Sequence, residues 1–485
     1  MQLACTSGRR LNHVRGCPRI AFSCMTPRIA AIATWGSQRM PPGFARNIAL
    51  AAFMAALAVA RPAVAQASQQ AQVHKASVDV RGAPDPKSPV VTTLKQGAAV
   101  NVAGQQGLWY RVSVPSGPSG YVRVNDVRMA YGKSASSSDV AGVFSGRAGK
   151  GRVSETAGVR GLDESDLRAA SFDSGQLAKM ESYRESAEKA ANEMHGANLH
   201  ERGIPYKPEE QAIAANKKGG ATQQQKRSGL SAARGLLSSL GLGSTTSDTA
   251  LGAADASVRK NGEELAEEEL QLGPQIAGRI LGAAPLWQDD AAQRRVNRVG
   301  RWLASHTGRP EMPWTFGVID TPDINAFAAP GGYVLVTRGM YELVDANDDQ
   351  ELAGVLAHEL SHVVQRDHYE VIRKQQMQAY GKDVALSHVS VGGGELGGMA
   401  KDYLAKNGAA VMLTSLDRGA EYRSDEAAEV YLARSGFDPL ALYAVLQKMT
   451  ALGSKAPGMA QLFRTHPPLD DRLDRLDHSK VVAGD

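Results

Sequence analysis

His358-Glu359-Leu360-Ser361-His362 is the stretch around which the rest of the chain can be interpreted. Two histidines four residues apart lie on the same face of an α-helix, because four residues slightly exceed one turn. Neutral imidazoles are frequent ligands of Zn²⁺, and a glutamate between them in sequence can act as general base toward the water in the remaining position. The stretch therefore predicts a catalytic zinc site. A chance match on a buried helix with core histidines is the less favoured alternative.

The residues on either side of this stretch predict a long helix. Asp348 followed by Glu351 matches an N-terminal capping pair. Apolar residues then recur with helical spacing at Leu352, Val355, Leu356, Leu360, Val363 and Val364.

Length and charge limit the classes of protein to be considered. The chain has 485 residues, which is enough for two or more domains. Its formal net charge is +5, and no cluster of Lys and Arg is dense enough for nucleic-acid binding. We therefore expect a mixed, solvated surface and no nucleic-acid partner.

Residues 1–65 are interpreted as an N-terminal extension that ends in a secretory signal. Residues 48–60 form a short apolar run, which follows a basic residue and precedes the small residues Ala63-Val64-Ala65. This pattern predicts cleavage after Ala65 and export to the periplasm or cell envelope, because the run is too short for an ordinary membrane-spanning helix. The true start remains open between Met1, Met25 and Met40.

The cysteines all precede the predicted cleavage site, at Cys5, Cys17 and Cys24. The mature chain is therefore expected to contain no disulfide and no thiolate metal ligand. This argues against a zinc hydrolase of the peptide deformylase type, which takes a cysteine as its third ligand. A cysteine is also missing at the cleavage site, so we expect no lipoprotein anchor.

Residues 70–132 predict a small all-β module of short strands separated by Gly- and Pro-containing turns. The module resembles bacterial SH3-like domains in four segments, which are Val80-Arg81, Leu94-Lys95-Gln96-Gly97, Trp109-Tyr110-Arg111-Val112 and Ser119-Gly120-Tyr121-Val122. The resemblance implies a binding or tethering module, in some relatives for cell-wall peptides. Trp109 and Tyr121 can line a groove or belong to the core, and a place in the core is favoured.

Residues 133–254 are interpreted as a flexible linker, because they are rich in small and polar residues. One amphipathic helix is expected within the linker, over residues 177–194. A further domain then occupies residues 255–480. It begins with an acidic helix whose residues 263–269 are expected to form a solvated face.

Two strands are predicted in this last domain, over residues 314–319 and 333–337. Between them lies an extended segment, Asn325-Ala326-Phe327-Ala328-Ala329-Pro330-Gly331-Gly332. An edge strand beside a cleft can bind a peptide substrate through main-chain hydrogen bonds. Asn325, Ala326 and Phe327 are therefore candidate substrate-binding residues, with ordinary sheet structure as an equally open alternative.

A catalytic zinc site needs a third protein ligand, and two candidates exist. His368 lies ten residues after His358, but that arrangement requires a glycine where Gln365 stands. If the helix continues instead, His368 points away from the face of the two histidines. Glu421 is the better candidate, because Glu421 and Asp425 share one face of a second predicted helix. The pair can supply one ligand and one carboxylate that orients a ligand histidine.

Four motifs in order resemble the gluzincin peptidases that include HtpX, the CAAX prenyl proteases and BepA. They are the segment from Asn325 to Gly332, the first histidine stretch, Glu421-Tyr422-Arg423-Ser424-Asp425, and Phe463-Arg464-Thr465-His466-Pro467-Pro468 followed by Arg472. The resemblance covers residues 255–478. It implies one Zn²⁺ per chain, held by His358, His362 and Glu421, with Glu359 as general base.

Three further residues match family positions. Asp425 matches a position often treated as a proton donor, although an orienting role is physically preferred because a carboxylate beside a ligand is ionised. His466 can stabilise an oxyanion, donate a proton to the leaving group or be structural. Arg472 matches the family's late arginine.

The region from residue 375 to residue 410 departs from the membrane-embedded relatives. It is rich in glycine and contains no apolar run long enough to span a bilayer. We therefore expect at most peripheral membrane association, and a lid over the cleft in this region.

The expected fold class is multidomain, with a small all-β SH3-like barrel and a mainly α (α+β) zincin-type metallopeptidase domain. The expected function is an exported zinc metalloendopeptidase. The resemblance implies misfolded or misassembled cell-envelope proteins as substrates, and cell-wall peptides or envelope proteins as possible partners of the SH3-like domain. The alternative is a chiefly non-catalytic chaperone or wall-binding scaffold with a latent zinc site.

Overall fold

A computed structural model describes five stretches of the chain. They are residues 68–131 except 116, 161–206, 224–232 except 227, 262–386, and 407–481 except 454, 455, 457 and 480. All of these residues belong to one compact unit, Ala65–Asp485, and the residues before it lie outside the described part of the chain. The predicted signal, the three cysteines and residues 387–406 at the centre of the expected lid also lie outside them.

The SH3-like domain is a seven-stranded antiparallel sheet in the order β3-β2-β6-β5-β4-β1-β7. The strands are β1 (Gln69–Val73), β2 (Ser77–Arg81), β3 (Val90–Lys95), β4 (Ala99–Gln106), β5 (Trp109–Ser113), β6 (Ser119–Arg123) and β7 (Val127–Met129). Alternate side chains of these strands, such as Val80, Val102 and Val112, are buried in its core. Gly120 lets β6 approach β2, because a Cβ there would lie 2.5 Å from the Arg81 carbonyl oxygen.

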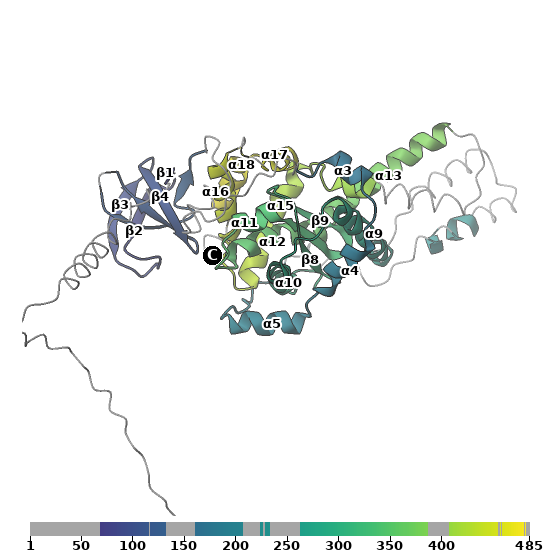
Figure 1. Ribbon diagram of the computed structural model, residues 1–485, viewed down its shortest axis with the longest axis horizontal. Helices are drawn as coiled ribbons and strands as arrows, with labels where there is room; N and C mark the ends of the chain where they lie inside the picture. Colours follow the sequence, from purple (N-terminus) through teal and green to yellow (C-terminus); the bar gives the residue numbers. More distant parts are fainter. Residues whose placement is uncertain are drawn as a thin grey trace, which may run out of the picture. The chain divides into compact units, whose positions relative to one another are not determined.

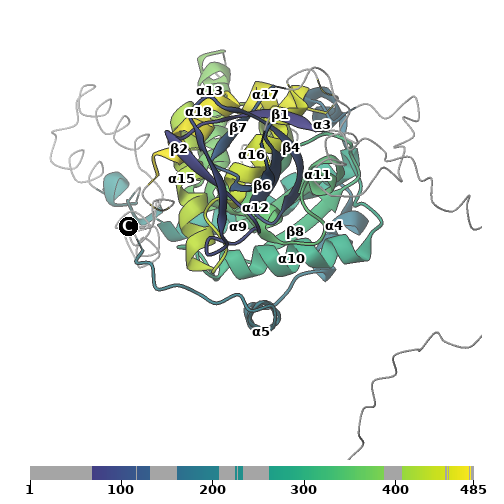
Figure 2. The ribbon, with the colours of Figure 1, turned by 90° about the vertical axis from the view of Figure 1, so that its left-hand side faces the viewer.

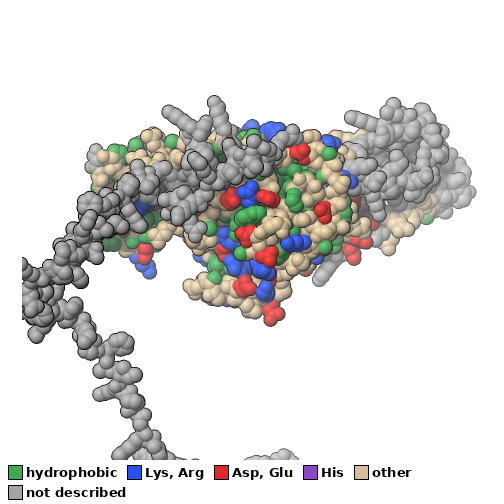
Figure 3. Space-filling model, viewed as in Figure 1, with side chains coloured by type: hydrophobic (Ala, Val, Ile, Leu, Met, Phe, Trp, Pro, Cys, Tyr) green, Lys and Arg blue, Asp and Glu red, His purple; other side chains and the backbone are tan. Residues whose placement is uncertain are grey.

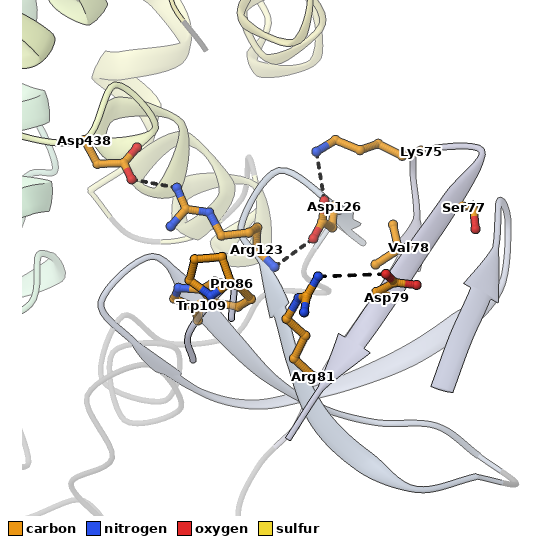
Figure 4. Close-up of a pocket in the computed structure, with 10 residues that line it drawn as sticks. All are labelled: Lys75, Ser77, Val78, Asp79, Arg81, Pro86, Trp109, Arg123, Asp126 and Asp438. Carbon is orange, nitrogen blue, oxygen red and sulfur yellow. Dashed lines mark hydrogen bonds and ion pairs between the residues drawn. The ribbon is translucent and has the colours of Figure 1, made fainter. Parts of the chain in front are cut away.

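A groove of about 600 Å³ runs along this domain (Figure 4). Trp109 borders the groove although it is buried, and Arg123 lies over its ring with 5.4 Å between guanidinium carbon and ring centroid. Tyr121 is half-buried. Each basic side chain lining the groove has an acidic partner, as Arg123 has in Asp438.

The second domain surrounds one long helix, α12 (Gln350–Gln365), which is green at the centre of Figure 1. It packs against α10, α15 and α16 on different sides and against β9. The surrounding helices are α9 (Gly262–Ala283), α10 (Asp290–Ala304), α11 (Arg338–Leu343), α13 (Asp367–Leu386), α15 (Arg418–Arg434), α16 (Ala441–Leu452), α17 (Ala460–Thr465) and α18 (Leu469–Asp477).

A three-stranded sheet in the order β8-β10-β9 completes this domain. β8 (Thr315–Ile319) and β10 (Tyr333–Thr337) are parallel, and β9 (Ala326–Ala329) pairs antiparallel with β10. The predicted strands are thus present, and β9 lies at an edge of the sheet. A short 3₁₀ turn, η1 (Pro330–Gly332), follows β9, and Gly331 adopts a φ of 75° there.

Part of the expected linker is folded. The helices α3 (Glu164–Ala169), α4 (Ser174–Ser182) and α5 (Ala187–Gly196) pack against the second domain through α9 and α10. The single amphipathic helix expected over residues 177–194 is therefore wrong in one respect, because it is two helices separated at residues 183–186. Its apolar positions are nevertheless buried, as Met180 and Met194 show.

Two local expectations are also corrected. The acidic run of α9 is not wholly solvated, because Glu269 is 1% exposed and forms ion pairs with Arg309 and Arg366. The Asp348–Glu351 capping pair is wrong, because Asp349 is the N-cap residue of α12. Glu351 is buried and pairs with Lys448 at 2.6 Å.

The two domains share one continuous hydrophobic core, which includes Val80 and Val112 of the SH3-like sheet and Tyr443 and Leu473 of the helical domain. Figure 2 shows the SH3-like strands in front of the helices. The predicted fold class, an all-β SH3-like domain with a mainly helical α+β domain, is confirmed.

The molecular surface carries both signs of charge. On the face shown in Figure 3, basic and acidic side chains are interspersed, as the modest net charge predicts. Within the described part of the chain, no helix combines the length and apolar composition needed to cross a membrane.

Candidate metal centre

Helix α12 brings the two histidines of the organising stretch together. The Nε2 atoms of His358 and His362 lie 3.2 Å apart, and the two rings are nearly perpendicular at 89°. Both side chains are buried, at 4% and 2% exposure. Their spacing of one helical turn produces this arrangement, because it places both on the same face of the helix.

Glu421 lies in the first turn of α15, and its carboxylate faces the Nε2 atoms of both histidines. Its Oε2 atom lies 3.6 Å from His358 Nε2, and its Oε1 atom lies 3.7 Å from His362 Nε2. One of them, Oε2, is buried and has no hydrogen-bond partner among the described residues. A buried carboxylate oxygen without a partner is unfavourable unless a cation occupies the site. Two imidazole nitrogens and this carboxylate therefore fit a divalent metal ion.

The outward-facing nitrogen of His358 has a carboxylate partner of its own. Asp425 Oδ1 lies 2.9 Å from His358 Nδ1. Arg472 donates two hydrogen bonds to Asp425, at 2.9 Å from Nε and 2.6 Å from Nη2. Asp425 and Arg472 are each 2% exposed. Asp425 thus accepts a hydrogen bond from the Nδ1–H group of His358, which leaves Nε2 of that ring free to coordinate a metal.

His362 is held in a similar way by two residues that sequence reasoning missed. Its Nδ1 lies 2.9 Å from Asp367 Oδ2 and 3.0 Å from Ser424 Oγ. Asp367 follows the turn that ends α12, and Ser424 precedes Asp425 in the second motif. An acidic residue directly after the histidine helix was the available signal for Asp367.

Burial and charge shift the pKa values at the centre. Burial alone would lower the pKa of His358, but hydrogen bonds to Asp425 and Glu421 raise it to about 9. Burial would raise the pKa of Glu421, but the facing histidines hold it well below its usual range. The centre therefore favours positive charge, as a proton or as a metal ion. Burial raises the pKa of the Glu359 carboxyl, which suits a group that must exchange protons.

His466, which directly follows the last residue of α17, also lies at the centre. Its Nε2 lies 3.6 Å from Glu421 Oε2, and its Nδ1 lies 2.8 Å from Thr465 Oγ1. His358, Glu421 and His466 form a group whose donor atoms lie within 4.8 Å of one another. Burial lowers the pKa of His466 to about 4, so this imidazole is neutral at pH 7.

A small cavity adjoins the centre, with Glu359, His362, Glu421 and His466 in its wall. Its volume of about 20 Å³ has room for roughly one water molecule. The segment that follows residue 406 closes one side through Met412, Thr414 and Leu416.

His368 lies in the wall of this cavity, contrary to the expectation that it points away. The helix does not continue, because Arg366 adopts a left-handed conformation at φ 64° and turns the chain. The ring of His368 then stacks edge-on at 5.6 Å from that of His362. The turn forms without a glycine, so the expectation about His368 that was based on Gln365 is wrong.

Of the three candidate substrate-binding residues, Asn325 and Ala326 line the cavity. The side-chain oxygen of Asn325 is buried without a hydrogen-bond partner among the described residues. Phe327 does not line the cavity, because its side chain alternates to the other face of β9 and packs in a core with Leu335.

The chain is similar to known proteins in both of its domains. Residues 290–480 match the family model Peptidase family M48, and residues 76–127 match Bacterial SH3 domain. The chain is 31% identical over 214 residues to the beta-barrel assembly-enhancing protease of Yersinia pestis, a match that covers 43% of each protein. It is 29% identical over 182 residues to the mitochondrial metalloendopeptidase OMA1 of Schizosaccharomyces pombe, covering 38% of this chain and 51% of that protein.

The extent of these matches differs among the relatives. The chain spans less than half the length of the beta-barrel assembly-enhancing proteases that it matches. It covers 78% of a protease HtpX homolog from Arthrobacter sp., with 31% identity over 241 residues. From the histidine helix, the edge strand and these matches together, it follows that the chain belongs to peptidase family M48 and carries a bacterial SH3 domain ahead of its peptidase domain.

Proposed function

We propose that the chain is a zinc-dependent metalloendopeptidase that hydrolyses peptide bonds. The observation that carries this proposal is the buried set of three facing donors, from His358, His362 and Glu421, beside the carboxyl of Glu359. Two histidines and one carboxylate leave a fourth position open, as catalytic zinc sites require. Family membership and the name metalloendopeptidase of one relative support the same activity.

The residues of the chain have separate roles in the proposed reaction. When bound, zinc would supply Lewis acidity toward the scissile carbonyl and the attacking water. Glu359 accepts the proton of the attacking water and delivers it to the leaving nitrogen, and its raised pKa suits both transfers. Asp425 keeps His358 in the ligating tautomer, and Asp367 does the same for His362.

The substrates are proposed to be misfolded or misassembled cell-envelope proteins. The name of the Yersinia pestis relative, beta-barrel assembly-enhancing protease, supports this class. The signal-like pattern before residue 66 supports export to the periplasm or envelope. The SH3-like domain would then bind envelope proteins or cell-wall peptides.

A latent zinc site is a second candidate function, and the position of His466 favours it. With its Nε2 3.6 Å from Glu421 Oε2, a neutral His466 can occupy the fourth position that a water needs. The adjoining cavity of about 20 Å³ is also too small for a peptide. Replacing His466 by Ala should raise the rate of casein cleavage if this candidate is correct, and should lower it if His466 assists the reaction.

Removal of the metal tests the proposed function. Full-length protein that cleaves casein should lose this activity after dialysis against a chelator and recover it on addition of one equivalent of Zn²⁺. Activity that survives removal of all bound metal would contradict the proposal.

A further inference from the structure

The SH3-like domain contacts an acidic face of helix α18. Asp470, Asp474 and Asp477 lie at helical spacing on one side of α18. Arg128, on β7, donates to Asp474 Oδ1 at 2.7 Å and to Asp477 Oδ2 at 2.5 Å. One SH3-like residue thus bridges two turns of a helix in the peptidase domain.

Two other SH3-like side chains hold the same face. His74 Nε2 lies 3.0 Å from Asp477 Oδ2, and the hydroxyl of Tyr131 donates to Asp470 Oδ2 at 2.9 Å. The Arg128 side chain is only 17% exposed, and its guanidinium lies over the Tyr443 ring at 5.3 Å. The Asp477 side chain is 11% exposed, whereas that of Asp474 is 63% exposed. Because solvent screens a buried pair less than an exposed one, the Arg128–Asp477 pair is the contact that can fix the position of α18.

The opposite side of α18 carries Arg472, which belongs to the metal centre. Arg472 binds both oxygens of Asp425, and Asp425 in turn accepts a hydrogen bond from Nδ1 of His358. α18 has nine residues, a length at which an isolated helix is not stable. Its rotation and register are therefore set by what it packs against, which includes the SH3-like domain.

The SH3-like domain also contacts the helix that carries the histidines. Gln105, near the end of β4, donates to Glu351 Oε1 at 2.6 Å, and Glu351 lies in the first turn of α12. Lys448 donates to the other oxygen of Glu351 at 2.6 Å. The domain therefore holds both the ligand helix α12 and the helix α18 that orients a ligand.

We propose that Arg128 is a positioning residue for the metal centre. By binding Asp474 and Asp477, it holds α18 in the register at which Arg472 aligns Asp425 with His358. The SH3-like domain is then a structural part of the metal site as well as a binding module. This inference rests on the proposed function only in that the centre must bind a metal.

Zinc affinity of the purified full-length chain tests this role, measured by competition with a chromophoric chelator. Arg128→Ala should weaken Zn²⁺ binding about 10-fold, the lower end of the effect of removing a residue that orients a ligand. Arg128→Lys should recover part of the affinity, because it retains the charge. The absorption spectrum of the Co²⁺-loaded Arg128→Ala chain should shift, reporting a changed ligand geometry that a loss of stability alone would not produce.

A matched pair of variants on α18 separates positioning from folding. Asp477→Asn should weaken zinc binding in the same direction as Arg128→Ala, because it removes the less exposed acidic partner of Arg128. Asp471→Asn removes an exposed acid of the same helix that makes none of these contacts, and should leave affinity within twofold. The pair decides the question even if Arg128→Ala does not fold.

The outcomes distinguish this inference from the proposed function. A wild-type chain that binds no zinc would contradict the proposed function itself. A wild type that binds zinc, with a folded Asp477→Asn variant of unchanged zinc affinity and unchanged cobalt spectrum, would overturn the positioning role alone, whether or not Arg128→Ala folds.

Discussion

Asp425 is the residue on which the orientation of His358 depends. Replacing it by Asn removes the acceptor of the His358 Nδ1 proton and leaves the buried Arg472 guanidinium without its ion-pair partner. We expect Asp425→Asn to weaken Zn²⁺ binding by about 10- to 100-fold. The unpaired guanidinium should also destabilise the fold by roughly 3–5 kcal/mol. Glu426→Gln, at the exposed neighbouring position, is the control and should neither weaken zinc binding nor destabilise the fold. Equal zinc affinity of wild type and Asp425→Asn would contradict the assignment.

Glu429 gives a prediction about pH. It is 1% exposed, and burial raises its pKa from 4.5 to about 8, with Asp425, Glu426 and Asp477 adding to the shift. The folded state therefore binds a proton that the unfolded state has already released above pH 4.5. Stability should fall as pH rises from 4.5 toward 8 and then stay level.

The variant Glu429→Gln removes this dependence. At pH 4 its free energy of unfolding should match that of the wild type, and at pH 8.5 it should exceed the wild-type value by about 2–4 kcal/mol. Denaturant titrations at the two pH values measure the difference. A difference that is the same at both pH values would show that ionisation of Glu429 is not the cause.

At this scale, spacing alone predicts part of the metal centre. His358 and His362 could be paired because a helix repeats every 3.6 residues, whatever the rest of the fold does. Glu421 was a candidate because it shares a helical face with Asp425, and the packing of α15 against α12 brings it to the histidines. His368 could not be placed, since its position depends on one left-handed residue, Arg366, where sequence preference is weak. Ser424 was missed because a serine within a helix has no distinctive spacing.

At the scale of elements, the contact between α12 and α16 depends on a glycine. A Cβ at Gly354 would lie 2.6 Å from the backbone nitrogen of Leu442. Gly354→Ala should therefore push the helices apart and destabilise the fold by about 1–3 kcal/mol, despite the higher helix propensity of alanine. Thermal unfolding followed by circular dichroism measures the effect.

Gly196→Ala is the matched control for this substitution. Gly196 ends α5, and nothing lies within 4 Å of a Cβ placed there. This variant should be as stable as the wild type or slightly more stable, because only propensity changes. Similar destabilisation by both substitutions would contradict the packing argument.

Periodicity predicts the elements themselves but not their polar contacts. The spans of α12, β8 and β10 follow from apolar spacing, which each segment carries on its own. Glu269 looks like one more residue of an acidic face, and only the fold brings it to Arg309 and Arg366. The ion pairs of Glu269 therefore depend on contacts between residues far apart in the sequence.

At the scale of the whole molecule, the shared core predicts cooperative unfolding. Residues of the SH3-like sheet and of α16 and α18 belong to one hydrophobic cluster. Gln447 of α16 also accepts from the Met129 backbone and donates to the Val127 carbonyl. We expect a single calorimetric transition, with equal calorimetric and van't Hoff enthalpies, for the two domains. Two separate transitions would show that the SH3-like domain folds independently.

The SH3-like and peptidase domains were each predictable, but their docking was not. Each domain carries its own pattern, in turn spacing and strand alternation or in helical motifs. The docking contacts join residues more than 300 positions apart, such as Arg123 with Asp438 and Arg128 with Asp474, and no local pattern reports them.

Metal-dependent peptide hydrolysis with Glu359 as base is the central claim. Its most direct test compares purified wild type and Glu359→Gln in two respects, zinc per chain and the rate of casein cleavage. The glutamine keeps the size of the side chain and cannot accept the proton. We predict about one zinc in both proteins and cleavage by the wild type only. Zinc binding with equal cleavage by both would contradict the role of Glu359, and a wild type without zinc would contradict the metal centre.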